Sequence, residues 1–159
     1  MTQPQRLIIP GATYFFTLRV EDQGSRLLTD HIESLRYAYA RAVQEFPVTC
    51  HAMVVLPDHL HAVWTEPEGG VWYAERWRRI KTRFAQAIPT RDTPIWQRRF
   101  REHAIRSRDE LHLAIQHCAQ NPVRHGLVSA PELWPYSSYS KGRSSDLAAV
   151  PRQRALLSA

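Results

Sequence analysis

The sequence predicts an α+β fold, in which one antiparallel β-sheet carries several amphipathic helices. Two features of the sequence lead to this prediction. Short segments that alternate apolar and polar residues, as half-buried strands do, are interspersed with longer segments whose apolar residues recur every three or four positions, as in helices. The chain has 159 residues, of which 43% are hydrophobic and 23% are charged, so it can form one domain with a packed core.

The first part of the chain predicts a strand followed by a helix. Residues 13–20 alternate apolar and mostly polar side chains, the pattern of a strand with one buried face. The helix follows at residues 30–46, where apolar residues recur at roughly helical spacing until Pro47. Asp30 and Glu33 have the spacing of a capping box, which predicts that this helix begins at Asp30.

Two antiparallel strands joined by a tight connection are predicted next. Residues 48–56 are apolar and rich in β-branched side chains, and the alternation resumes at residues 59–65. Pro57 and Asp58 lie between the two segments, and both residue types favour turns. Because the connection is short, we expect the two strands to pair as a hairpin.

A second amphipathic helix is predicted at residues 71–88. Trp77, Ile80, Phe84 and Ala87 have the spacing of one helix face, and we expect this face to pack against the core. The segment is also rich in arginine, so its aromatic rings could instead stack on nucleobases. The helical spacing favours the core.

The last two predicted elements are a short strand near residues 103–106 and a third helix. Ser107 and Glu110 have the spacing of a capping box, which predicts where the helix begins. Pro122 disfavours the α conformation in the residue before it, so we expect the helix to end near Asn121.

These elements follow one another in the order β-α-β-β-α-β-α. That order favours an antiparallel sheet with helices packed mainly on one face, close to a ferredoxin-like arrangement. Residues 1–139 form the single predicted domain, and we expect residues 140–159 to be a flexible C-terminal tail.

The composition argues against several classes of protein. The longest apolar run, residues 52–56, is far shorter than the ~20 residues that cross a bilayer, so we expect no membrane span. Two cysteines cannot form a disulfide framework or a four-cysteine zinc site, and the first residues lack a secretory apolar segment. We therefore expect a cytoplasmic location.

The basic residues predict an anionic partner. The chain has a formal charge of +6, and 19 of its 21 basic residues are arginine, whose planar guanidinium can bind phosphate through two hydrogen bonds. Residues 76–108 hold 11 of the basic side chains but only Asp92 and Glu102 as acids. This segregation favours a nucleic-acid interface over a merely soluble surface. The arginines expected to contact DNA in this segment are Arg76, Arg79, Arg83, Arg98, Arg99 and Arg101.

Two histidines in the second predicted strand of the hairpin are candidate metal ligands. His59 and His61 are two residues apart, so their side chains would lie on the same face of the strand and could bind one divalent ion. Such a pair can also be an ordinary surface feature. A complete metal site needs a further ligand from elsewhere in the fold.

Three sequence blocks resemble one family of DNA-processing proteins. The segment MVVLPDHLHAVW at residues 53–64 resembles the His-hydrophobic-His block of the single-tyrosine transposases. More narrowly, NPVRHGLV at residues 121–128 and WPYSSY at residues 134–139 resemble REP-associated tyrosine transposases, which act on repetitive extragenic palindromes. The resemblance runs from about residue 11 to residue 139. It implies a ferredoxin-like fold, a divalent metal such as magnesium or manganese, and cleavage and rejoining of single-stranded DNA beside a hairpin.

The same resemblance implies roles for individual residues. His59 and His61 would bind the metal, and Asn121 would supply the third ligand from the last helix. From the residues alone Asn121 could cap the helix end, and both roles are compatible because its amide has separate donor and acceptor atoms. Arg124 would contact phosphate, whereas His125 could simply be a cation at the helix end, where the dipole favours it.

One position departs from the family pattern. In the family the nucleophilic tyrosine lies one helical turn before the asparagine, and here that position is His117. His117 could attack phosphorus as a neutral imidazole, could bind the metal as an extra ligand, or could be an inert replacement in a protein that only binds DNA.

Three functions follow from these observations. The first is a metal-dependent protein of the REP-associated transposase type that binds hairpin-containing single-stranded DNA and cleaves it. The second is a domesticated DNA-binding protein without strand transfer, which the histidine at position 117 motivates. The third is a phosphoesterase that acts on free nucleotides, but the sequence has no glycine-rich phosphate-binding loop. The resemblance favours a monomer.

Overall fold

The helices and strands follow one another in the order that the sequence predicts, with one short helix added. The computed structural model of the chain describes residues 11–89 and 93–140. Its elements are β1 (Thr13–Arg19), α1 (Leu27–Asp30), α2 (Ile32–Glu45), β2 (Thr49–Val55), β3 (His59–Thr65), α3 (Tyr73–Ala87), β4 (Arg101–Ile105), α4 (Arg108–Arg124) and the 3-10 turn η1 (Pro131–Leu133).

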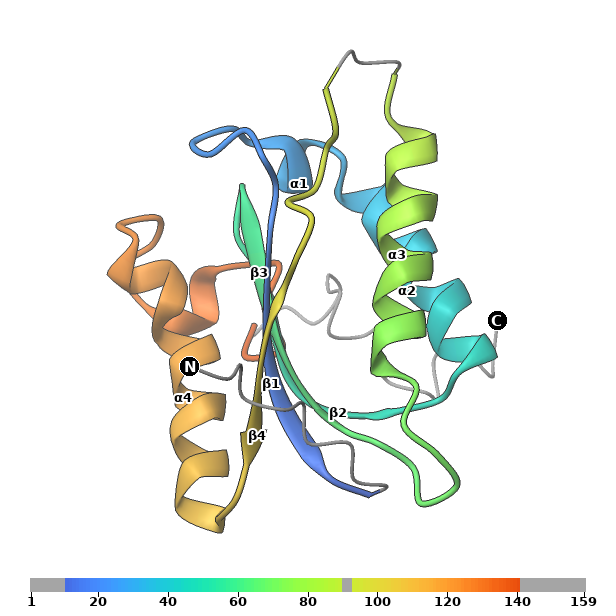
Figure 1. Cartoon of the computed structure of the whole chain (residues 1–159). Helices are drawn as coiled ribbons and strands as arrows, with labels where there is room; N and C mark the ends of the chain where they lie inside the picture. Colours follow the sequence, from blue (N-terminus) through green and yellow to red (C-terminus); the bar gives the residue numbers. More distant parts are fainter. Residues whose placement is uncertain (1–10, 90–92, 141–159) are drawn as a thin grey trace, which may run out of the picture.

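The four strands form one antiparallel sheet in the order β2-β3-β1-β4. With α2 and α3 as the two crossover helices, this is the ferredoxin-like arrangement, and the predicted α+β fold class is confirmed. Figure 1 shows α2 and α3 side by side on one face of the sheet, whereas α4 lies alone on the opposite face. The sheet is therefore covered on both faces.

The larger core lies between the sheet and the pair α2 and α3. The indole of Trp64 stacks on that of Trp77 with 4.1 Å between ring centroids, and Phe16 packs edge-on against both. Trp77, Ile80 and Phe84 are fully buried, which confirms these three positions of the predicted inner face of α3. Ala87, the fourth predicted position, is exposed at the end of the helix. These aromatic rings are core residues, so they are not available to stack on nucleobases.

Arg76 also lies in this core, and its predicted contact with DNA is wrong. Its side chain is 0% exposed and forms a two-pronged ion pair with the buried carboxylate of Glu66, at 2.9 and 3.1 Å. Its Nε donates a further hydrogen bond to the carbonyl of Phe46. A buried guanidinium needs such partners, because an unpaired buried charge is costly. One member of the arginine-rich segment therefore has a structural role in the core.

A smaller core lies between the sheet and α4. Val54 and Leu56 at the end of β2 and Val63 of β3 pack against Cys118 of α4. Since Leu60, Ala62 and Trp64 point into the larger core, β3 is buried on both faces. This burial fixes the direction of each β3 side chain, including the two histidines.

The predicted start of the first helix is wrong. Asp30 ends the short helix α1, and α2 begins after His31 with no side-chain cap. Glu33 pairs with Arg36 at 3.3 Å instead of closing a capping box. The short helix α1 buries Leu27 and Leu28 in the larger core before α2 begins.

The predicted start of α4 is confirmed, but its predicted end is wrong. Ser107 Oγ accepts a hydrogen bond of 3.1 Å from the backbone N–H of Glu110. The helix continues through Pro122 to Arg124, because Asn121 and Pro122 are both buried and packing outweighs the local preference of a residue before proline. Asn121 therefore keeps helical geometry.

The end of α4 is a glycine cap. Gly126 has φ +72°, in the left-handed region that glycine adopts at little cost. Its N–H donates to the carbonyl of Val123 at 2.9 Å, and the N–H of Leu127 donates to that of Pro122 at 2.9 Å, the bonds of a Schellman motif.

The segment after η1 covers the free edge of β2. Backbone bonds of 2.8 Å join Val55 to Tyr136 and Met53 to Ser138, and the indole N–H of Trp134 donates to the carbonyl of Val55. Covering an edge strand protects it from pairing with other chains. Except for Ser140, the tail predicted at residues 140–159 lies outside the described residues. Among the helices that the structure describes, none has the length and apolar character needed to cross a membrane.

Candidate functional site

His59 and His61 lie on the face of β3 that α4 covers, and they are only 4% and 5% exposed. Register places His61 opposite Thr17 and His59 opposite Arg19 on the neighbouring strand β1. Because residues two apart on a strand share a face, the two imidazoles are neighbours, with 5.2 Å between ring centroids.

Hydrogen bonds at Nδ1 orient both imidazole rings. Nδ1 of His59 lies 2.7 Å from the carboxylate of Asp58, and Nδ1 of His61 lies 2.8 Å from the hydroxyl of Thr17. Burial opposes ionisation of Asp58, but hydrogen bonds from the Gly24 N–H and from His59 lower its pKa. A carboxylate only accepts, so neutral His59 donates from Nδ1 and carries its lone pair on Nε2. This pattern is typical of histidines that bind metals.

The helix α4 brings two more side chains to these rings. His117 contacts His61 edge-on, with 5.1 Å between centroids. The amide Nδ2 of Asn121 lies 3.0 Å from Nε2 of His117 and can donate a hydrogen bond to it. The structure therefore brings together the three residues that the resemblance assigns to the metal and His117, which it assigns to the position of the nucleophile.

The side-chain oxygen of Asn121 indicates whether a metal ion fits this site. Its Oδ1 is buried and has no hydrogen-bond partner among the described residues. A buried acceptor without a partner is unfavourable unless a ligand satisfies it, and an amide oxygen is a suitable metal ligand. In the described ranges no group of three or more His, Cys, Asp or Glu side chains could hold a metal, so a site here depends on this amide.

The imidazoles are neutral at physiological pH. Burial, with repulsion from His59 and His117 where these are protonated and from Arg19, lowers the pKa of His61 to about 3. Burial also lowers the pKa of His59, against the opposing effect of its bond to Asp58, and that of His117. Neutral imidazole is the form that binds a metal ion, because its lone pair is free of a proton.

His125 belongs to the site, although its sequence position suggested only a cation at a helix end. Its ring contacts that of His59, with 5.2 Å between centroids. The four rings therefore form a continuous row, His117-His61-His59-His125. The signal was present in the sequence, because His117, Asn121 and His125 are four residues apart and such residues share one helix face.

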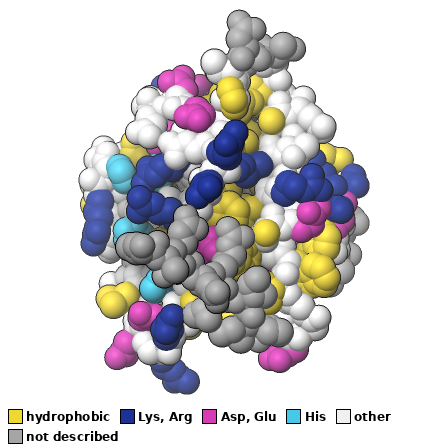
Figure 2. All heavy atoms as spheres, in the orientation of Figure 1, with side chains coloured by type: hydrophobic (Ala, Val, Ile, Leu, Met, Phe, Trp, Pro, Cys, Tyr) yellow, Lys and Arg dark blue, Asp and Glu magenta, His cyan; other side chains and the backbone are white. Residues whose placement is uncertain are grey.

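The predicted DNA-binding arginines fall into two groups. Arg79 and Arg83 of α3 are bound to the carboxylate of Glu45 at 3.1 and 2.7 Å, on the side of the sheet opposite the histidines. The exposed arginines, which form no ion pair with a carboxylate in the part of the chain that the structure describes, are Arg98, Arg99, Arg101 and Arg124. Figure 2 shows dark blue Lys and Arg side chains beside cyan histidines on the face that carries β4.

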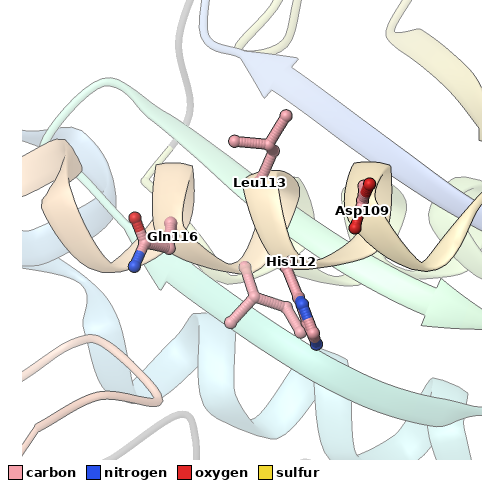
Figure 3. A pocket seen from close by; sticks show the side chains of 5 residues that line it. Asp109, His112, Leu113 and Gln116 are labelled. Carbon is pink, nitrogen blue, oxygen red and sulfur yellow. The ribbon is translucent and has the colours of Figure 1, made fainter.

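Two small hollows flank the row of rings. One, of about 250 Å³, lies beside His117 and is lined by Phe15 and Ala114. The other, of about 220 Å³, lies beside His59 and His125. A third depression of about 600 Å³ lies on the outer face of α4, where the labelled side chains spread along the helix and do not converge on one point (Figure 3).

Known proteins share both the sequence and the fold. Over 141 residues the chain is 38% identical to the REP-associated tyrosine transposase of Escherichia coli (strain K12), covering 89% of this chain and 84% of the relative. A Haemophilus influenzae relative, also named for REP-associated tyrosine transposases, is 34% identical over 159 residues, covering 92% and 90%. No protein-family model matches the chain.

Solved structures agree with this relationship. A REP-associated tyrosine transposase bound to a REP hairpin superposes with a TM-score of 0.82 and 39% identity, covering 87% of this chain and 83% of that one. A Deinococcus radiodurans protein, with a TM-score of 0.50 and 13% identity over 78% and 97% of the two chains, shares the fold alone. On this sequence identity and coverage, the chain belongs to the REP-associated tyrosine transposases.

Proposed function

We propose that this chain binds hairpin-containing DNA with a single-stranded flank and, with a divalent metal ion, cleaves and rejoins that strand. The observation that carries the proposal is the buried Oδ1 of Asn121, which lacks a hydrogen-bond partner among the described residues and lies beside the row of imidazoles. The hairpin held by the REP-associated relative supports the choice of substrate.

His59, His61 and Asn121 would hold the ion. Two imidazole nitrogens and an amide oxygen suit Mn²⁺ better than Mg²⁺, which prefers oxygen ligands and water. When bound, the ion would act as a Lewis acid on the scissile phosphate. The chain itself supplies orientation, since Asp58 and Thr17 hold the two rings in place before substrate arrives.

In this proposal His117 is the attacking group. The amide N–H of Asn121 donates a hydrogen bond to the lone pair on Nε2 of His117 until the substrate displaces it. This nitrogen forms a bond to phosphorus while the bond from phosphorus to the 3′-oxygen breaks. The 3′-oxygen takes a proton from water, and the imidazole loses its N–H proton. The resulting phosphoramidate remains activated, so a 3′-hydroxyl can attack it and rejoin the strand.

The test is cleavage of a labelled REP-type hairpin with a single-stranded flank, run on a denaturing gel with Mn²⁺, Mg²⁺ or EDTA. We expect a cut product only with metal. H59A and H61A should each slow cleavage by more than about a hundredfold, since even the outer partners of metal ligands are worth about 10–100-fold. His112 is an exposed histidine on the outer face of α4, so H112A is the matched control and should stay within about twofold of the wild type.

Two results would contradict the proposal. Cleavage that survives EDTA or the loss of both His59 and His61 would exclude the metal site. Tight binding of the hairpin without cleavage in either metal would replace the proposal by DNA binding without strand transfer.

A further inference from the structure

Arg19 is an exposed guanidinium at the edge of the histidine site that the sequence motifs do not single out. It ends β1 and is paired in register with His59. In an antiparallel sheet, directly paired residues project to the same face, with Cβ atoms about 4.5–5.5 Å apart. Phe15 and Thr17, which precede it at intervals of two, contact the cluster under α4 and His61, so Arg19 lies on the same face.

The backbone around Arg19 is fixed on both sides. Its carbonyl accepts a hydrogen bond of 2.9 Å from the N–H of Gln97. The next residue, Val20, donates to the carbonyl of Asp58 at 3.0 Å and is bridged to Trp96. The base of the side chain is therefore held beside the Asp58-His59 turn, while the guanidinium reaches solvent.

Arg19 also differs from the paired arginines of α3. Within the described ranges it forms no ion pair with a carboxylate, unlike Arg76, Arg79 and Arg83. A guanidinium without such an ion pair is free to form charge-assisted hydrogen bonds with a phosphate.

We propose that Arg19 binds the DNA phosphate that docks against His59 and His61, and that it forms one side of a phosphate clamp whose other side is Arg124. Arg124 is exposed at the end of α4, two turns after His117 on the same helix face, so its guanidinium also lies beside the row of rings. This inference rests on the proposed function. A bidentate guanidinium would fix the phosphate in one orientation, which a lysine would do less well.

The test measures binding of the flanked hairpin in EDTA, so it does not depend on metal or cleavage. R19Q should weaken binding by about tenfold or more, the usual effect of losing a charge-assisted hydrogen bond. R19K should recover part of this loss. Arg41 is an exposed arginine of α2 on the opposite face, so R41Q removes the same charge and should stay within about twofold of the wild type. Thermal unfolding of each variant checks that it is folded.

Replacing one DNA phosphate at a time by an uncharged methylphosphonate then shows which phosphate Arg19 contacts. Methylphosphonate at one position in the flanking strand should weaken binding by the wild type but not further weaken R19Q. Equal losses for both proteins at every position would overturn the inference, as would R19Q binding like R41Q. A wild type that binds the hairpin but never cleaves it contradicts the proposed cleavage and leaves this test intact. A wild type that does not bind the hairpin overturns both.

Discussion

His117, Asn121 and His125 are four residues apart on α4, so one helix face presents all three to the histidines of β3. Each has a different effect there. His117 contacts His61, His125 contacts His59, and Asn121 leaves an acceptor oxygen buried without a described partner. The site therefore combines the imidazoles of β3 with side chains from one face of α4.

Replacing His117 by tyrosine tests the role of this position. H117Y should restore the family nucleophile and give a protein–DNA adduct that survives acid, because a phosphotyrosine ester is far more acid-stable than a phosphoramidate. H117A should form no adduct and should still bind the hairpin. The measurement is a denaturing protein gel with labelled DNA, before and after acid treatment. Cleavage by H117A at the wild-type rate would show that another group attacks.

Two elements place the site: the β2-β3 hairpin fixes the histidines, and α4 packs on the sheet face that carries them. The end of α4 is held by Gly126, whose φ of +72° favours glycine. Apart from the chain neighbours of Gly126, no heavy atom of the described residues lies within 4 Å of where a Cβ would be added, so alanine there would suffer only the cost of the backbone conformation.

We expect G126A to lower the free energy of unfolding by about 1 kcal/mol, since a left-handed residue with a Cβ costs roughly 1–2 kcal/mol. Urea unfolding at neutral pH measures it. Gly69 is the control, because it also has open space around it but does not have a φ in the left-handed region. G69A should leave stability unchanged within about 0.5 kcal/mol. Equal losses in both variants would contradict the role of the cap.

The ion pairs of Glu45 in α2 with Arg79 and Arg83 in α3 should make the stability of the fold depend on pH. A hydrogen bond from Arg83, with a further one from Arg79, lowers the pKa of Glu45 from 4.5 to about 2. Because the pKa is lower in the folded state, the stabilisation is fully present above about pH 4.5 and is lost as the pH falls towards 2. E45Q should therefore lower stability at pH 7, by less than about 1 kcal/mol for a pair near the surface. This difference should shrink at pH 3 in urea unfolding. A difference that is constant with pH would contradict the assignment.

The described arginines on the two faces of the sheet differ in whether a carboxylate neutralises their charge. Arg76, Arg79 and Arg83 are bound to carboxylates on the α2 and α3 side, whereas the arginines near β4 and the end of α4 have no described acidic partner. Only the second group is free to replace counterions on DNA.

Salt dependence of hairpin binding tests this division. If Arg19, Arg98, Arg99, Arg101 and Arg124 each contact one phosphate, log Kd should change with log salt with a slope of about 4, at roughly 0.7–0.9 per phosphate. Removing Arg98 or Arg101 should lower the slope by about 1, and removing Arg79 or Arg83 should leave it unchanged. A flat salt response, or equal effects from both groups, would contradict the division.

Local pattern was enough to predict the strands, the order of elements and the buried positions Trp77, Ile80 and Phe84 of α3, because these follow from periodicity. It could not show that Arg76 is buried, since its partner Glu66 comes from another element and is brought to it only by folding. The extension of α4 past Pro122 likewise depends on packing. Arg19 carries no motif, and only the pairing of β1 with β3 places it beside His59.

The central claim is that β3 and α4 together hold one divalent ion. Electron paramagnetic resonance of bound Mn²⁺, with the histidines labelled with ¹⁵N, tests it most directly. We expect hyperfine coupling to two imidazole nitrogens in the wild type and to one in either H59A or H61A, and weaker Mn²⁺ binding in N121A. Mn²⁺ that shows coupling only to water, or a spectrum unchanged by the loss of His59 or His61, would contradict the account.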